Sequence, residues 1–166
     1  MDQSGIRLVP MTPEMYHQYF REYENDPDLC PDREKYVHYV YSGERADRYI
    51  RRQAGLKRIP LAIMLGDEIV GEILLKNIEE RRSATLSIAL KNAAFKDRGY
   101  GTRAEILAVR YVFSELDIPV LYADALRSNT RSQHVLEKAG FTLTGEDEDF
   151  KYYRIDRPAA DPPAAP

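Results

Sequence analysis

A glycine-rich segment, residues 96–102, stands directly before a long stretch with an apolar stripe and is the part of the chain best suited to hold a phosphate. Glycines there let the backbone turn tightly and bring N–H groups close to a ligand. The first turn of a following helix adds unpaired N–H donors and a partial positive charge. An ordinary strand-to-helix turn would use the same residue types, so this segment alone leaves both interpretations open.

Two other phosphate motifs can be compared with this segment. A Walker loop requires a lysine after its second glycine, and neither that lysine nor the spacing is present. Residues 99–104 do match G-x-G-x-x-A, the dinucleotide fingerprint. That fingerprint follows its strand directly, whereas a polar loop over residues 91–98 intervenes here, and no second βαβ half follows. Nicotinamide-dependent redox chemistry is therefore a minor alternative, which a titration with NAD would reveal.

Composition and charge exclude several other classes of function. The formal net charge is 24 − 27 = −3, and a protein that binds duplex nucleic acid usually carries a basic face, so nucleic acid is not an expected partner. Cys30 is the single cysteine, which excludes an internal disulfide framework and a cysteine-rich metal site. The start of the chain shows no secretory pattern, and the apolar stretches are too short to span a bilayer. We expect a cytoplasmic domain with no metal and no membrane association.

The spacing of apolar residues predicts a mixed α/β domain. Strands are predicted at residues 6–10, 59–65, 69–77, 83–90, 120–125, 141–144 and 150–155. Helices are predicted from the cap Thr12 to before Pro27 and at residues 32–41, 44–56, 102–116 and 129–138. Ser42 is expected to cap the helix at 44–56, and Gly55 and Gly140 to end helices in the left-handed conformation. One domain is expected over residues 1–156, followed by a disordered Pro/Ala-rich tail over residues 157–166.

Two motifs resemble a known family. Residues 87–90, the loop 96–101 and the helix that starts at Thr102 resemble motif A of the GNAT superfamily of acyl-CoA-dependent N-acetyltransferases. The signature of motif A is Gln or Arg, two residues, Gly, one residue, and Gly or Ala. Residues 128–141 resemble motif B, and their pattern N-x-x-S-x-x-V-L-E-K-x-G-F is most similar to the branch that includes ribosomal-protein alanine acetyltransferases. Residues 7–10 and 25–27 are similar to the same branch, and the resemblance covers about residues 5–156.

This resemblance implies a fold and a cofactor. The fold is a central, mostly antiparallel sheet of about seven strands, flanked by helices, with a V-shaped opening between the fourth and fifth strands. The cofactor is acetyl-CoA, whose pantetheine arm pairs with a strand backbone and whose diphosphate lies on backbone amides of residues 98–102. The acetyl carbonyl receives an N–H near Ala89 and Leu90. The implied cofactor-binding residues are Ile88, Ala89, Leu90, Lys96, Arg98, Gly99, Tyr100, Gly101, Thr102, Asn129 and Ser132.

Two positions depart from the family pattern. Lys96 stands where Gln or Arg is usual, a change that backbone binding of the diphosphate tolerates. Leu136 stands where many relatives carry a tyrosine that protonates the departing thiolate, which a leucine cannot do. Asn129 and Ser132 face the same side of their helix, and in the resembled branch these positions approach the pantetheine and the sulfur. Ser132 is therefore the first candidate for donating a hydrogen bond or proton to the thiolate.

A base must take a proton from the attacking ammonium before or during attack on the thioester. Glu72 and Asp124, on two different strands, are the candidates, and neither is clearly preferred; water, His38 and His134 are further options. Cys30 has no neighbour that would mark an activated nucleophile. We therefore expect direct attack in a ternary complex rather than an acyl-cysteine route.

The sequence thus predicts an N-acetyltransferase that transfers acetyl from acetyl-CoA to a primary amine of a small molecule or peptide. A protein N-terminus, a polyamine and an amino sugar are all possible acceptors. Acidic clusters at residues 22–28 and 146–149 would attract a cationic amine if they border the acceptor site, and are otherwise solvated charge runs. A homodimer is implied by the resemblance alone. The alternative function is an acyl-CoA-binding module of the same fold without efficient catalysis, which Leu136 favours.

Overall fold

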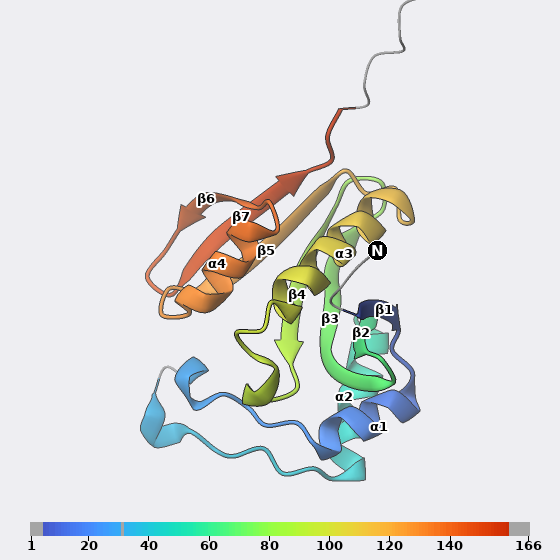
Figure 1. Ribbon diagram of the computed structural model, residues 1–166, viewed down its shortest axis with the longest axis vertical. Coiled ribbons are helices and arrows are strands. Elements are labelled where there is room, and N and C mark those ends of the chain that lie inside the picture. The colour runs from blue at the N-terminus through green and yellow to red at the C-terminus, as the bar shows by residue number, and fades with distance from the viewer. Residues whose placement is uncertain (1–4, 31, 160–166) are drawn as a thin grey trace, which may run out of the picture.

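The computed structural model describes residues 5–30 and 32–159. In this part of the chain seven strands form one sheet in the order β1-β2-β3-β4-β5-β7-β6 (Figure 1). The strands are β1 (Ile6–Pro10), β2 (Ile59–Leu65), β3 (Glu68–Glu79), β4 (Ser83–Leu90), β5 (Val120–Leu126), β6 (Thr142–Glu146) and β7 (Phe150–Asp156). Neighbouring strands are antiparallel except β4 and β5, which are parallel. The predicted fold class and the predicted strands are confirmed.

The helices begin and end within two residues of the predicted bounds, except that the first helix ends at Arg21 rather than just before Pro27. They are α1 (Pro13–Arg21), α2 (Gly43–Gly55), α3 (Tyr100–Ser114) and α4 (Thr130–Lys138). The side chains of Thr12 and Ser42 cap α1 and α2, each accepting a backbone N–H at 3.2 Å. Gly140 has φ of 100°, as predicted, but the prediction for Gly55 is wrong, because one further bonded turn follows it and Lys57 takes the left-handed conformation with φ of 52°.

The predicted helix at residues 32–41 is wrong. A single 3-10 turn, η2 (Arg33–Lys35), is present there, and the chain then runs extended to α2. The side chain of Asn25 explains the difference, because its amide donates to the Val37 carbonyl at 2.8 Å and its oxygen accepts the Tyr39 N–H at 2.7 Å. The Val37 carbonyl and the Tyr39 N–H are thus bonded to Asn25 instead of to backbone groups of a helix. Val37 is 75% exposed, so a helix here would also bury little apolar surface.

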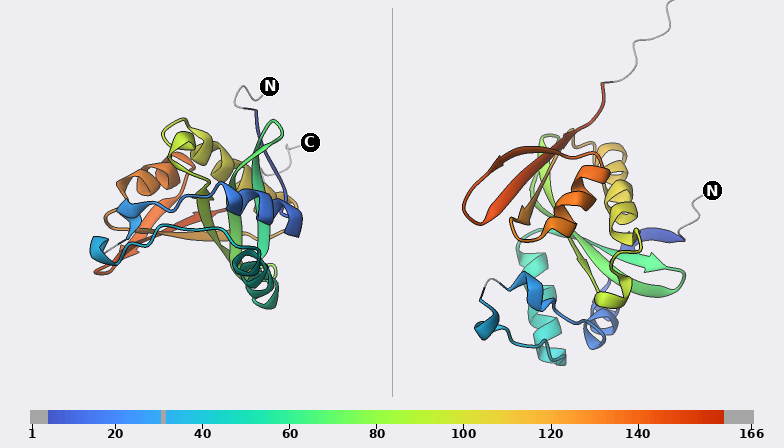
Figure 2. Two further views of the ribbon diagram at one scale, coloured as in Figure 1. Left: turned by 90° about the horizontal axis from the view of Figure 1, so that it is seen from below. Right: turned by 60° about the vertical axis from the view of Figure 1, so that its left-hand side comes forward.

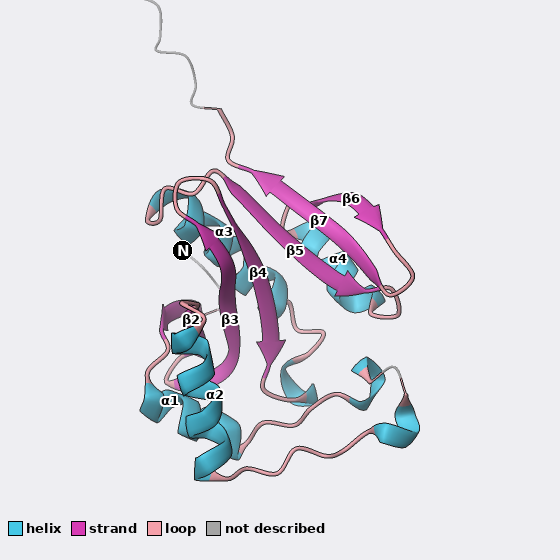
Figure 3. Cartoon of the chain, turned by 180° about the vertical axis from the view of Figure 1, so that it is seen from behind, coloured by secondary structure: helices cyan, strands magenta, loops and turns pink. Residues whose placement is uncertain are grey.

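The helices lie on both faces of the sheet. Figures 2 and 3 show α1 and α2 on one face and α3 and α4 on the other. The larger core cluster lies beneath α3 and α4 and includes Leu86, Val112 and Leu121. The second cluster lies beneath α1 and α2 and is rich in aromatic rings, among them Tyr16 and Phe20. The apolar faces of all four helices are thus buried against one sheet.

The sheet opens between β4 and β5. Residues 83–86 of β4 pair with residues 120–123 of β5, and residues 87–90 have no partner on that side. Figure 3 shows the two strands diverging toward the ends of β4 and β5. The predicted V-shaped opening is therefore present, and it exposes one backbone edge of β4 over its last four residues.

The described part of the chain ends at residue 159, so residues 160–166 of the predicted tail lie outside it. Arg157 still contacts the domain, because its guanidinium lies 2.7 Å from the Asp117 carboxylate. Among the described residues no helix has the length and apolar character that crossing a membrane requires. The same residues hold no group of three or more metal-ligating side chains.

Candidate functional site

Two adjoining cavities occupy the opening between β4 and β5. The first cavity is bordered by the end of β4, the start of α3, the start of α4 and the segment after α1. The second cavity lies between β4 and β5 and reaches Asp124, Leu136 and Phe150. Five residues line both cavities: Leu29, Ile88, Glu105, Asn129 and Ser132. The opening therefore forms one continuous slot along the unpaired edge of β4.

The backbone groups that face this slot follow from the pairing of β4 with β3. The N–H of Lys91 donates to the Val70 carbonyl at 2.8 Å, so it points toward β3. Because backbone groups of successive residues in a strand point to opposite sides, Ala89 also faces β3, whereas Ile88 and Leu90 face the slot. Of the two N–H groups considered from the sequence, that of Leu90 is therefore available to a ligand.

The start of α3 presents further free N–H groups. Gly99 precedes the helix with φ of 79° and provides no side-chain cap. The first helical bond joins the Arg103 N–H to the Gly99 carbonyl at 3.0 Å, which leaves the N–H groups of Tyr100, Gly101 and Thr102 without helical partners. They are three of the amides of residues 98–102 that the sequence predicted, although the helix begins two residues before the predicted start at residue 102.

Gly101 brings three elements close together at this point. A Cβ there would lie 3.8 Å from the Val135 side chain on α4 and 3.9 Å from the Ile88 side chain on β4. Because those distances are ordinary contacts, any larger side chain would fill the entrance between α3, α4 and β4. The glycine thus keeps the start of the helix open to the slot.

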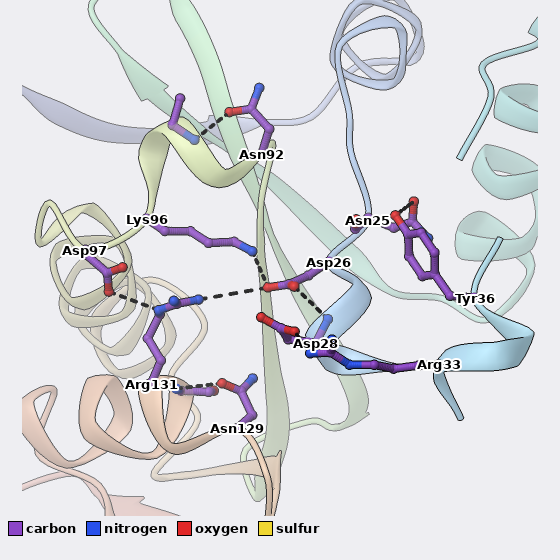
Figure 4. Close-up of polar contacts among 12 residues, drawn as sticks. Asn25, Asp26, Asp28, Arg33, Tyr36, Asn92, Lys96, Asp97, Asn129 and Arg131 are labelled. Atoms are coloured by element: carbon purple, nitrogen blue, oxygen red, sulfur yellow. Dashed lines mark hydrogen bonds and ion pairs between the residues drawn. The ribbon is translucent and has the colours of Figure 1, made fainter. Parts of the chain in front are cut away.

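Two cations that are paired with carboxylates lie beside these amides. Lys96 forms an ion pair with the Asp26 carboxylate, and Arg131 Nη1 lies 3.9 Å from the same carboxylate (Figure 4). Arg131 Nε also donates to Asp97 at 2.9 Å. Burial alone would raise the pKa of Asp26, but the hydrogen bonds from Lys96 and the Asp28 N–H, with the nearby Arg131, hold it below its usual value. Lys96 was predicted, whereas Arg131 and the role of Asp26 were not, because residues distant in sequence form this contact.

Asn129 and Ser132 lie at the start of α4. The Asn129 side chain accepts the Ser132 N–H at 3.1 Å and so caps the helix, as predicted. Both residues line both cavities. The predicted residues Ile88, Ala89, Leu90, Lys96 and Gly101 line the first cavity with them, and the exposed Arg98 lies on the loop that leads to it.

The two candidate bases occupy different surroundings. Glu72 lies opposite Ala89 in the β3–β4 pairing and is 6% exposed. Its carboxylate accepts hydroxyl hydrogen bonds from Tyr16 and, at 2.9 Å, from Tyr49. Burial raises the pKa of Glu72, although the two hydroxyl hydrogen bonds oppose that shift. Asp124, in contrast, is exposed and lines the second cavity.

The acidic cluster at residues 22–28 is largely neutralised by ion pairs. Glu22 lies 2.5 Å from the buried ammonium of Lys91, and Asp28 pairs with Arg33. Asp26 pairs with Lys96 as described above. Glu24 lines the first cavity and forms no ion pair with another described residue, so it is the member of the cluster that could attract a cation into the slot.

One site residue, Glu105, was missed. It lies on α3, lines both cavities, and is 0% exposed, with neither carboxylate oxygen hydrogen-bonded within the described structure. Burial raises the pKa of Glu105 to about 8. An acidic residue within the apolar stripe of this helix was the available signal, because a charged side chain is rarely fully buried without a partner.

Comparison with known proteins identifies the family. The family model described as "Acetyltransferase (GNAT) domain" matches residues 6–142. The chain belongs to the GNAT acetyltransferase family. Membership confirms the predicted family resemblance and the prediction of an N-acetyltransferase with acetyl-CoA as donor. No curated protein sequence matches this acetyltransferase significantly.

Solved structures share the fold of this acetyltransferase at low sequence identity. A GNAT acetyltransferase from Bacillus anthracis is 18% identical with a TM-score of 0.70, over 94% of this chain and 97% of that one. The aminoglycoside acetyltransferase AAC(6')-Ib, in a complex with paromomycin and acetyl-CoA, is 17% identical with a TM-score of 0.76, over 92% and 94%. A chimera of the Vibrio cholerae spermidine N-acetyltransferase is 15% identical with a TM-score of 0.74, over 92% and 96%. At such identities the likeness shows the fold alone.

Proposed function

We propose that this acetyltransferase binds acetyl-CoA along the slot between β4 and β5 and transfers the acetyl group to a primary amine by direct attack in a ternary complex. The observation that carries the proposal is the unpaired edge of β4, which lies beside the uncapped first turn of α3. An extended amide-bearing chain can pair with such an edge as an added strand. A diphosphate is stabilised by the free N–H groups and positive end of a helix.

The residues that would hold the donor divide into two sets. Backbone groups of Ile88 and Leu90 pair with the pantetheine arm, and the amides of Gly99, Tyr100, Gly101 and Thr102 hold the diphosphate. Lys96 and Arg98, with Arg131, add positive charge at the same place. Asn129 and Ser132 border the slot from α4 and contact the pantetheine near its sulfur.

The reaction requires the chain to stabilise the carbonyl oxygen, to stabilise the leaving thiolate and to accept a proton from the amine. The thioester supplies an activated acetyl group, and the Leu90 N–H stabilises the charge that develops on its carbonyl oxygen. Ser132 donates a hydrogen bond to the thiolate as it leaves. Glu72 is one candidate for the base, because burial raises its pKa and it lies opposite Ala89, which lines the first cavity; Glu72 itself lines neither cavity, so a water must relay the proton to it. Asp124 is the alternative base on the opposite wall.

The acceptor is a cationic primary amine of a small molecule or peptide. Glu24 at the first cavity and Asp124 at the second give the slot negative charge that favours a cation. The neighbours named for aminoglycosides and for spermidine are similar in fold and are named for substrates rich in amines. Cytoplasmic action and a homodimer stay predictions, which fractionation and light scattering would measure.

The test is release of thiol from acetyl-CoA with a panel of amines. The panel contains spermidine, an aminoglycoside and a peptide with an N-terminal alanine. The peptide is included because the second motif is similar to that of ribosomal-protein alanine acetyltransferases. Amine-dependent thiol release supports the proposal. Tight binding of coenzyme A in calorimetry without turnover on any amine would instead support the second candidate, an acyl-CoA-binding module. Leu136, which is 2% exposed where many relatives carry an acidic tyrosine hydroxyl, favours that candidate.

A further inference from the structure

Glu105 is the most unusual titratable group in the described structure. Its side chain is fully buried, and neither oxygen has a hydrogen-bond partner among the described residues. A buried carboxyl without a partner destabilises a fold unless it stays neutral. A residue that lowers stability in this way and lines a ligand cavity is a candidate for a functional role.

The place of Glu105 on α3 fixes what it faces. It follows Gly101 by four residues, so it lies on the same side of the helix, about 6 Å further along the axis. That side of α3 faces Ile88 on β4 and Val135 on α4. Glu105 therefore lies deeper in the slot than the diphosphate amides, at the junction of the two cavities.

The proposed reaction needs a proton donor for the leaving sulfur, and the residues considered so far do not supply one. When the thioester breaks, sulfur leaves with an electron pair and needs a proton. Leu136, which also lines the second cavity, cannot provide one. Ser132 can donate a hydrogen bond, but a serine hydroxyl holds its proton too strongly to be the final donor.

We propose that Glu105, neutral before the reaction, is the general acid that protonates the sulfur of coenzyme A. The inference rests on the proposed function. The amine nitrogen bonds to the carbonyl carbon, the C–S bond breaks, its electron pair stays on sulfur, and the Glu105 proton moves to that sulfur. The proton lost by the amine passes through the base and solvent to the Glu105 carboxylate, which restores the neutral acid.

The acidity of Glu105 suits this role. Its pKa of about 8 keeps it protonated at neutral pH and lies close to the pKa of about 8.5 of an alkyl thiol such as cysteine. Proton transfer is most efficient when donor and acceptor are matched near the operating pH. The other charged residues that line the two cavities are Glu24, Asp26, Lys96, Arg131 and Asp124, and burial is the cause of the pKa shift at Glu105.

The test uses Glu105→Gln, with Glu115→Gln at the exposed end of the same helix as the matched control. We expect Glu105→Gln to lower kcat by about 10²- to 10⁴-fold while the Kd for coenzyme A changes less than about threefold, because the change removes a proton donor and keeps the shape. The wild-type kcat should fall as the pH rises through about 8, and Glu105→Gln should lose that limb. A wild-type rate with an unchanged pH profile would overturn the inference.

A binding measurement separates this inference from the proposed function. If the wild-type protein acetylates no amine, the proposed function fails, yet contact between Glu105 and sulfur is still measurable. In the wild-type protein the ratio of the affinities for coenzyme A and desulfo-coenzyme A should differ from that in Glu105→Gln. An equal ratio in the two proteins would overturn the inference. A lower Tm for Glu105→Gln with an unchanged kcat would mark a purely structural group and overturn it too.

Discussion

Replacing Gly99 by valine tests the proposal that backbone amides hold the diphosphate. Gly99 has φ of 79°, and no atom lies within 4 Å of a Cβ placed there. The substitution therefore introduces no clash, and its effect is confined to the backbone. Holding a β-branched residue in the left-handed region costs about 1–3 kcal/mol.

The exposed loop can avoid this cost in the free protein by changing φ, but the amides of Tyr100, Gly101 and Thr102 then turn away from the diphosphate. Binding must restore them, so the same free energy is subtracted from the affinity. At 1.4 kcal/mol per factor of ten, about 1–3 kcal/mol raises the Kd for coenzyme A by about 5- to 150-fold.

Gly66→Val provides the matched control. Gly66 has φ of 60° and equally open surroundings, but it lies in the turn between β2 and β3, away from the slot. Isothermal titration calorimetry with coenzyme A and thermal unfolding of all three proteins make the comparison. Both variants should show only a small loss of Tm, and Gly66→Val should keep the wild-type Kd for coenzyme A. If Gly99→Val also binds coenzyme A with the wild-type Kd, the turn before α3 does not hold the diphosphate.

Three further outcomes are expected. Ser132→Ala should lower kcat at least about tenfold with little change in the Kd for coenzyme A, as measured by steady-state kinetics and calorimetry; a loss of affinity alone would contradict the role at sulfur. Glu72→Gln should lower the free energy of unfolding by about 1–3 kcal/mol, because the hydroxyls of Tyr16 and Tyr49 lose a charged acceptor; an unchanged denaturant midpoint would contradict this. The raised pKa of Glu105 means that the folded state binds its proton more tightly than the unfolded state, so stability is lost as the pH rises from about 5 through about 8. The difference in Tm between Glu105→Gln and the wild-type protein should therefore grow over that range, and a constant difference would refute it.

The strands and the glycine loop could be predicted from the sequence because their signals are local. Alternation, turn residues and the glycine spacing each act over a few neighbouring positions. The prediction of a helix at residues 32–41 was wrong because Asn25, more than ten residues earlier, bonds to the backbone of Val37 and Tyr39. No local pattern records such a bond.

The candidate site was predicted unevenly for the same reason. Residues of the two motifs meet at the slot because their elements are neighbours in a fold that the motifs identify. The contact of Asp26 with Lys96 and Arg131 joins three separate parts of the chain. The unpartnered state of Glu105 depends on what surrounds it in space, since burial and missing partners are properties of packing rather than of residue type.

The carboxylate of Asp26 ties the segment after α1 to the two cations beside the start of α3. An anion that binds those cations competes with Asp26, and Asp26 belongs to the segment that also provides Tyr23, Glu24 and Leu29 to the cavity wall. Binding of acetyl-CoA and the shape of the acceptor wall are therefore expected to be coupled. In that case, an amine that prefers the displaced wall strengthens the binding of acetyl-CoA by the same factor by which acetyl-CoA strengthens the binding of the amine.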